Sequence, residues 1–204
     1  IGGDPDNRLG PMTRWLVERR DLYAGKRVLD LASNAGHFPM VYAANGAESV
    51  TAVEPRAVFG RFFDRELGRF PEASAITWLT RDVRQFVPEE NYGVLSCLGL
   101  IYHMKDGWSH LARIVRQCKA KTLIFDSMLW AEAHTALETG LLNTNCAGLV
   151  EQVNRPSKAS VEAKFMELGW SHELVLENWQ RPKALRGMWL VNLNGTGAMK
   201  SPAT

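Results

Sequence analysis

The sequence predicts an α/β fold, in which the strands of a sheet alternate along the chain with the helices that cover it. Two apolar runs, residues 28–31 and 49–53, read as buried strands, and a helical stretch lies between them. Pro39 stands near the first turn of that helix, where its missing N–H would have had no partner. With 204 residues, of which 46% are hydrophobic, the chain can bury one sizeable core, so we expect a single domain over residues 1–204.

The remaining elements follow from the spacing of apolar residues. Met12, Trp15 and Leu16 share one side of a helical segment within residues 1–20. A third strand over 76–80 is indicated by β-branched and aromatic content, and a helix follows a fourth strand. A fifth strand is expected over residues 122–125, and a helix over residues 157–169 that ends at a glycine. Two last strands are expected over residues 172–176 and 188–193. Residues 128–156 read as an irregular lid or substrate-binding segment, and residues 195–204 as a frayed tail.

The turn after the first strand has the composition of a nucleoside-binding site. The strand ends in an acid, Asp30, and small residues fill positions 32–36 before the helix. The second strand is closed by Glu54. Small turn residues let a ligand approach the backbone, a helix N-terminus offers free N–H groups, and a strand-tip acid accepts hydrogen bonds from ribose hydroxyls. This run therefore predicts a site for a nucleoside cofactor.

The glycine pattern of this turn argues against a dinucleotide. A dinucleotide-binding fold has G-x-G-x-x-G, so that a pyrophosphate lies against bare backbone. Ala32 and Asn34 occupy the first two glycine positions, and Gly36 alone remains. Asn34 tolerates left-handed backbone, but its side chain would crowd a pyrophosphate. A nicotinamide-dependent dehydrogenase is therefore the less favoured alternative, and a nucleoside without phosphate fits better.

Three motifs resemble those of the class I S-adenosylmethionine-dependent methyltransferases. Residues 30–38, D-L-A-S-N-A-G-H-F, resemble the first motif of that family. Asp82 follows the third strand, where the family has an acid that meets the adenine amino group. Residues 92–106, Y-G-V-L-S-C-L-G-L-I-Y-H-M-K-D, resemble the F-D-x-V-x-x-x-G-V-L-Y-H motif of the tRNA uridine-34 carboxymethyltransferase branch and its small-molecule relatives. Together the motifs cover roughly residues 20–130 in the family's order.

This resemblance implies a fold, a cofactor and a set of binding residues. The implied fold is a Rossmann-like three-layer sandwich with a mostly parallel seven-stranded sheet, in the order 3-2-1-4-5-7-6 and with the seventh strand antiparallel. The implied cofactor is S-adenosylmethionine, with S-adenosylhomocysteine as product. The implied cofactor-binding residues are Asp30, Ala32, Ser33, Asn34, Gly36, His37, Phe38, Glu54, Pro55, Arg56, Asp82, Val83, Leu98 and Gly99. No metal is implied.

Tyr102 and His103 are the candidate catalytic residues. They follow the fourth strand, and ligands of open α/β folds lie beyond the carboxyl ends of the strands. The sulfonium makes the methyl group electrophilic, so the protein must place a nucleophile in line behind it. His103 is the candidate general base because the pKa of histidine lies near neutrality. Other roles remain open, namely that His103 only shapes the pocket floor, and that Tyr102 orients substrate, faces the sulfonium end of the cofactor or packs under a lid.

The acceptor is expected to be a small molecule, and two other functions stay open. A tRNA-modifying (carboxy)methyltransferase normally has a longer N-terminal extension than the roughly twenty residues found before the first strand here. Arg61, Arg65 and Arg69 recur at i, i+4 and i+8 and could read phosphates, but Asp64 and Glu66 interleave with them, which favours a solvated face. A cofactor-binding module without catalysis would keep the same acids and differ only in turnover.

The net charge and the cysteines indicate which partners and which cell compartment to expect. A net charge of +2 does not by itself indicate a nucleic-acid partner. Cys97, Cys118 and Cys146 lack metal-type spacing, and the first two fall at core positions, so we expect reduced core thiols. The odd cysteine number and the lack of a secretory or membrane-spanning stretch indicate the cytoplasm. The chain begins at Ile1 rather than Met, which suggests a piece of a longer protein, and its oligomeric state is left open.

Overall fold

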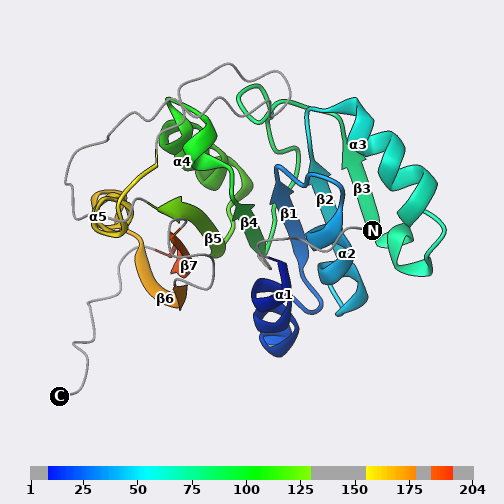
Figure 1. Cartoon of the computed structure of the whole chain (residues 1–204), viewed down its shortest axis with the longest axis horizontal. Helices are drawn as coiled ribbons and strands as arrows, with labels where there is room; N and C mark the ends of the chain where they lie inside the picture. Colours follow the sequence, from blue (N-terminus) through cyan, green and yellow to red (C-terminus); the bar gives the residue numbers. More distant parts are fainter. Residues whose placement is uncertain (1–8, 130–154, 178–184, 195–204) are drawn as a thin grey trace.

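Helices and strands alternate along the chain in the computed structural model (Figure 1). The structure describes residues 9–129, 155–177 and 185–194. The strands are β1 (Arg27–Leu31), β2 (Ser49–Val53), β3 (Ile76–Leu79), β4 (Val94–Leu98), β5 (Thr122–Leu129), β6 (Ser171–Glu177) and β7 (Leu185–Asn192). The α-helices are α1 (Leu9–Glu18), α2 (His37–Ala44), α3 (Ala57–Phe62), α4 (Gly107–Cys118) and α5 (Lys158–Glu167). Short 3₁₀ or π turns are η1 (Arg20–Leu22), η2 (Phe63–Leu67), η3 (Pro71–Ala75) and η4 (Ile101–His103).

The sheet has the predicted order, β3-β2-β1-β4-β5-β7-β6. The first five strands pair in parallel, whereas β7 runs antiparallel to both β5 and β6. The prediction of a mostly parallel sheet with an antiparallel seventh strand is therefore confirmed. Parallel strands place their carboxyl ends at one edge of a sheet, so the segments that follow β1, β2, β3 and β4 meet there.

Two apolar clusters cover the two faces of the sheet. One joins α1 and α2 to alternate strand residues, including Met12 and Val28, and the other joins α4 and α5 to their neighbours, including Leu29 and Phe165. Val28 and Leu29 are adjacent in β1 and bury opposite faces, as expected for a strand covered on both sides. Figure 1 shows the helices on either side of the sheet, which gives the predicted three layers.

The fifth strand is longer than the prediction of residues 122–125. It continues to Leu129 and pairs along its whole length with β7, so residues 128–129 are strand and not part of the irregular segment. The strand was predicted to end before Asp126 and Ser127 because polar residues usually lie beyond the end of a buried strand. Both residues are fully buried here. The last strands likewise begin earlier than predicted, at Ser171 and Leu185.

The helix after Glu54 does not carry a straight arginine stripe. It is α-helical only over Ala57–Phe62 and continues as a π turn, Phe63–Leu67. A π turn has more residues per turn than an α-helix, so the i, i+4, i+8 spacing no longer marks one face. Arg69 lies after this turn, so the three arginines do not share one helix face, but all three are exposed, as the favoured interpretation of a solvated surface expected.

Several expected segments lie outside the described residues. They are residues 1–8 of the N-terminal helical segment, residues 130–154 of the irregular segment and the tail over 195–204. Among the helices of the described ranges, none has the length and apolar character needed to cross a bilayer. Cys97 and Cys118 are buried free thiols, as predicted, and Cys146 falls in the range not described.

Candidate functional site

Backbone hydrogen bonds join the carboxyl ends of the parallel strands, and we call this side of the sheet the strand-end edge. The Ser33 N–H donates to the Val53 carbonyl (3.1 Å), and the Glu54 N–H donates to the Leu79 carbonyl (3.0 Å). Further along, the Gly99 N–H donates to the Asp126 carbonyl (3.0 Å). The predicted site residues after β1, β2 and β4 therefore lie along one continuous edge, with each segment held by its neighbour.

The turn between β1 and α2 adopts the left-handed backbone that was expected of Asn34, and it does so at Ala32 as well. Ala32, Asn34 and Gly36 have φ of 59°, 51° and 90°. Gly36 is required for a second reason, because a Cβ there would lie 2.7 Å from the Phe63 ring. The Ser33 hydroxyl donates to the Asp30 carbonyl (3.0 Å) and closes the turn. The helix α2 then starts with no side chain capping it, so its first N–H groups face the turn.

Glu54 is the most heavily bonded residue of this edge. Its side chain is fully buried, and its Oε2 accepts from the Asn34 N–H (3.0 Å), which ties the tip of β2 to the turn after β1. Arg56 donates to the same carboxylate from its backbone N–H (3.1 Å) and from its guanidinium (Nε to Oε1, 2.5 Å; Nη2 to Oε2, 3.1 Å). The carboxylate therefore holds the turn in place and is itself held by the arginine two residues on.

Asp82 has the same arrangement with Arg84. The Arg84 backbone N–H and its Nε donate to Oδ1 (2.9 and 3.0 Å), and Nη2 donates to Oδ2 (2.6 Å). Hydrogen bonding from Arg84 outweighs partial burial and lowers the pKa of Asp82. Asp82 is thus an ionised acceptor that is partly exposed after β3, where the resemblance expects an adenine contact.

Asp30 faces inward and is part of a buried polar chain. Its Oδ1 accepts from the Ser96 hydroxyl (2.5 Å), and Ser96 in turn accepts from the Tyr42 hydroxyl (3.1 Å). Burial raises the pKa of Asp30 to about 6, against the hydrogen bonds from Ser96 and Ser33 and with a smaller contribution from the Glu54 charge. This acid therefore joins β1, β4 and α2 beneath the turn.

The raised pKa of Asp30 gives an expected pH dependence of stability. Because the folded state holds this proton up to about pH 6 and the unfolded chain releases it near pH 4, the folded state binds more protons between these values. The free energy of unfolding should then fall as pH rises through this window, by up to about 1.4 kcal/mol per pH unit from this group. Denaturant melts at intervals from pH 4 to 7 measure the slope, and Asp30→Asn should flatten it. An equal slope in the variant would assign the effect to other groups.

Tyr102 and His103 lie in the η4 turn after β4. Tyr102 is buried, His103 is half-buried, and their ring centroids are 4.3 Å apart. Gly99, with φ of 81°, redirects the chain from β4 into this turn. The two candidate catalytic rings therefore lie side by side just beyond the carboxyl end of β4, as predicted.

A buried ion pair lies against this turn. Arg186 of β7 donates from Nε to Oδ1 of Asp126 (3.0 Å) and from Nη2 to Oδ2, and both side chains are almost completely buried. The Arg186 guanidinium carbon lies 5.8 Å from the centroid of the Tyr102 ring. Burial opposes the charge of Arg186, but the Asp126 carboxylate outweighs it and, together with Tyr102, raises the pKa of Arg186. The pair thus supports the Tyr102 ring from within the sheet.

Other predicted residues are split between surface and core. His37 is exposed, and its Nε2 lies 2.7 Å from the Thr13 hydroxyl of α1, which connects α1 to the start of α2. Pro55 is exposed beside Arg56. Three predicted side chains pack in the apolar clusters, namely those of Phe38, Val83 and Leu98. Within the described residues, no three His, Cys, Asp or Glu side chains gather as a metal ion would need.

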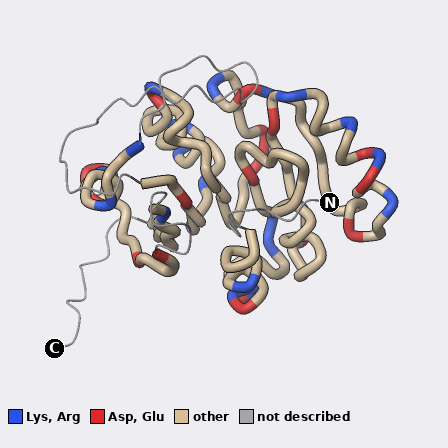
Figure 2. Tube along the Cα trace, viewed as in Figure 1, with Lys and Arg blue, Asp and Glu red and all other residues tan. Residues whose placement is uncertain are grey.

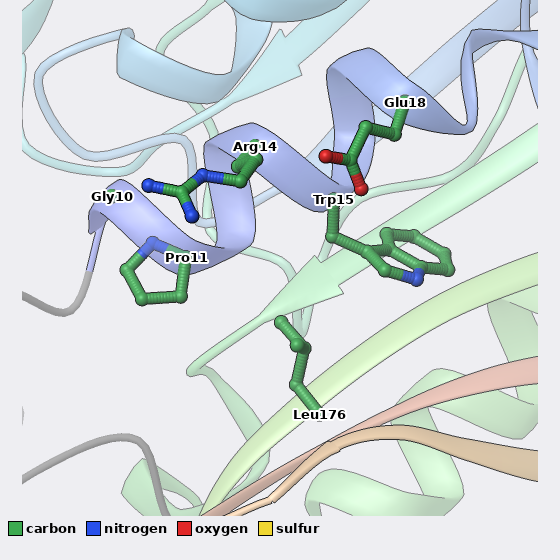
Figure 3. A pocket seen from close by; sticks show the side chains of 6 residues that line it. All are labelled: Gly10, Pro11, Arg14, Trp15, Glu18 and Leu176. Carbon is green, nitrogen blue, oxygen red and sulfur yellow. The ribbon is translucent and has the colours of Figure 1, made fainter.

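One pocket on the described residues lies elsewhere. It has a volume of about 390 Å³ and is formed between α1 and β6, by Gly10, Pro11, Arg14, Trp15, Glu18 and Leu176 (Figure 3). Figure 3 shows Arg14, Trp15 and Glu18 projecting from α1 and Leu176 facing them from the sheet. The pocket contains no residue of the strand-end edge, so we do not place the candidate site there.

The hydrogen bonds between the acids and their partners were not predicted from the sequence. Arg84, Ser96 and Asp126 were not singled out as site residues, although each bonds to a predicted one or supports it. The repeated spacing E-P-R at 54–56 and D-V-R at 82–84 is the one available signal, since an arginine two residues after a strand-tip acid can fold back onto it. Arg186 and Asp126 come from strands sixty residues apart, and the sequence has no local sign of their pairing.

The fold is that of the class I S-adenosylmethionine-dependent methyltransferases. The N-terminal domain of EvdMO1, solved in the presence of S-adenosylhomocysteine and D-fucose, superposes with a TM-score of 0.72 at 18% identity over 93% of this chain and 84% of that one. The DhpI–SAM–HEP complex has a TM-score of 0.65 at 14% identity over 90% and 86%. Magnesium protoporphyrin IX methyltransferase from Synechocystis PCC 6803, solved with bound S-adenosylmethionine, has a TM-score of 0.65 and 16% identity. That match covers 90% of this chain and 77% of the other. No family model and no curated protein sequence matches the chain.

Proposed function

We propose that this protein is an S-adenosylmethionine-dependent methyltransferase that transfers the methyl group in line to a small-molecule acceptor. The observation that carries the proposal is the arrangement at the strand-end edge. The left-handed turn after β1 is bonded through Asn34 to Glu54, and acids follow both β2 and β3. A nucleoside needs this combination of close backbone and strand-tip acceptors.

The residues of this edge fit the cofactor. Glu54 would accept from the ribose hydroxyls and Asp82 from the adenine amino group, while the turn from Ala32 to Gly36 leaves room for the methionine part. S-adenosylmethionine supplies an electrophilic methyl group, and the chain has to orient the acceptor toward it and exclude water. Tyr102 and His103 follow the neighbouring strand, β4, at the same edge, which suits a role toward the acceptor.

A small acceptor is favoured by the charge distribution. Figure 2 shows acidic and basic residues interspersed along α3 and the turn after it, where a nucleic-acid surface would have been expected. Arg65 is paired with Glu66 (2.6 Å), and Asp64 lies beside them, so this stretch has no single sign of charge. The solved structures reported above were obtained with D-fucose and HEP, or belong to a protoporphyrin methyltransferase, which supports small acceptors in proteins of this fold.

Thermal shift assays test the cofactor assignment. S-adenosylmethionine and S-adenosylhomocysteine should each raise the melting temperature, because a ligand that binds only the folded state stabilises it. At a free ligand concentration of about 100 times the Kd, the free energy of unfolding rises by roughly 2.7 kcal/mol. NAD serves as the control, and a shift with NAD alone would contradict the proposal. A non-catalytic binding module would show the same shifts, and only turnover with an acceptor separates it from an enzyme.

His103 is the candidate general base, and the alternative is that it only shapes the pocket floor. If it removes a proton during transfer, His103→Gln should reduce turnover by about 10²-fold or more and leave cofactor affinity nearly constant. The wild-type rate should also fall below about pH 6.5, where an ordinary histidine is protonated. Single-turnover rates over a pH series, with wild type and variant saturated with cofactor, measure both effects. Near-normal turnover with an unchanged pH profile would leave His103 with a purely structural role.

A further inference from the structure

Arg56 fills the acceptor positions of Glu54 that a ribose would use. A carboxylate has about four lone-pair positions, two on each oxygen. Oε1 accepts from the backbone N–H and the Nε of Arg56, and Oε2 accepts from the Asn34 N–H and from Nη2 of Arg56. Two of these four bonds come from the guanidinium, one to each oxygen. The carboxylate is thus saturated by the chain itself.

The guanidinium fork and a vicinal diol present the same pattern to a carboxylate. Each offers two donors, spaced to reach both oxygens at once. Both cannot bind Glu54 together, because the backbone donors of Asn34 and Arg56 hold the other two positions. We propose that Arg56 is an internal competitor for the ribose subsite, displaced only by a ligand that carries both ribose hydroxyls. This inference rests on the proposed function, in which Glu54 binds the ribose.

The structure also offers the displaced side chain a place to go. The Arg56 guanidinium carbon lies 4.2 Å from the centroid of the Phe59 ring, one turn along α3. The Arg56 side chain is a quarter exposed, so it can move toward solvent while it keeps this stacking contact. Glu54 is fully buried and cannot move in the same way. Exchange at this subsite therefore moves the arginine and leaves the acid fixed.

Competition of this kind weakens the binding of a nucleoside that carries the diol. A ligand with two hydroxyls has to break both guanidinium bonds before its own hydroxyls satisfy the buried carboxylate. A ligand without hydroxyls leaves the guanidinium on Glu54, so it neither gains a bond to the carboxylate nor has to break one. Arg56 thus lowers the affinity for the diol ligand without contacting the bound nucleoside.

Isothermal titration calorimetry with two Arg56 variants tests the inference. We expect Arg56→Ala to bind S-adenosylhomocysteine about tenfold more tightly than wild type, because the two guanidinium bonds no longer have to be broken. Arg56→Met keeps the alkyl stem over Phe59 and should show the same gain, which guards against a folding defect in the alanine variant. Adenosine should gain similarly, whereas 2′,3′-dideoxyadenosine should gain nothing, because it has no hydroxyls to take the place of the guanidinium.

Arg65→Ala is the matched control, since it removes an arginine charge from the exposed turn that follows α3. Its affinity for S-adenosylhomocysteine should equal that of wild type, and an equal gain in this variant would attribute the effect to net charge and overturn the inference. Equal or weaker binding in both Arg56 variants, or an equal gain for 2′,3′-dideoxyadenosine, would also overturn it while the proposed function stands. If neither wild type nor variants bind S-adenosylhomocysteine, the proposed function fails and the inference fails with it.

Discussion

Asp126→Ala is expected to lower the free energy of unfolding by about 3–5 kcal/mol, because it leaves the buried Arg186 guanidinium without its counter-ion. Both side chains are almost completely buried, so water cannot replace the lost carboxylate. The melting temperature should fall by about 2–4 °C for each kcal/mol in a chain of this size. Urea unfolding followed by tryptophan fluorescence measures the loss.

A second variant separates the cost of an unpaired charge from the worth of the pair. Replacing both residues by apolar ones, Asp126→Leu with Arg186→Met, should recover much of the stability, since apolar replacements of a buried ion pair are often neutral. Asp21→Ala is the control, because Asp21 forms an exposed pair with Arg19 and should change stability by less than about 1 kcal/mol. A loss for Asp126→Ala no larger than for Asp21→Ala would show that water reaches Arg186.

The apolar alternation of the strands made much of the fold predictable. The run from β1 through the turn to β2 has a clear sequence pattern, and its bounds match the prediction within a residue or so. The strand order came from the family resemblance, because periodicity does not say which strands are neighbours. The length of β5 was missed because Asp126 looks like a strand end until its partner in β7 is known. A charge buried by a distant partner is not visible in a local pattern.

The candidate site was predictable as a set of positions but not as a set of contacts. The structure places Asn34, Glu54 and Tyr102 at the strand-end edge, as the motifs indicate. The sequence does not say that Glu54 is fully buried or that Arg56 folds back on it, since both depend on the side-chain packing around the turn. It also suggests that Asp30 faces a ligand, whereas its side chain lies beneath the turn, bonded to Ser96.

Glu54→Ala is the variant expected to affect both folding and cofactor binding. At a simple strand tip the loss of a carboxylate would leave the fold intact, but here it removes the acceptor of the Asn34 N–H and of three Arg56 donors. We expect the free energy of unfolding to fall by about 2–4 kcal/mol, since four hydrogen bonds to a buried carboxylate are lost. Affinity for S-adenosylhomocysteine should fall by about 1.5–3 kcal/mol, the range for a hydrogen bond to a charged group. Denaturation and calorimetry measure the two quantities separately.

The binding loss is meaningful only if the variant is folded, so Glu54→Gln and Glu90→Ala complete the experiment. The glutamine keeps one acceptor for Asn34 and should stabilise the turn more than alanine, yet it cannot accept a diol on both oxygens. Glu90 forms an exposed pair with Arg27, and removing it should leave binding unchanged. Unchanged affinity in a folded Glu54→Gln variant would place the nucleoside away from β2. A loss of affinity in a Glu54→Gln variant that is folded at the assay temperature would instead assign the ribose to Glu54, because a purely structural carboxylate affects the ligand only through the fold.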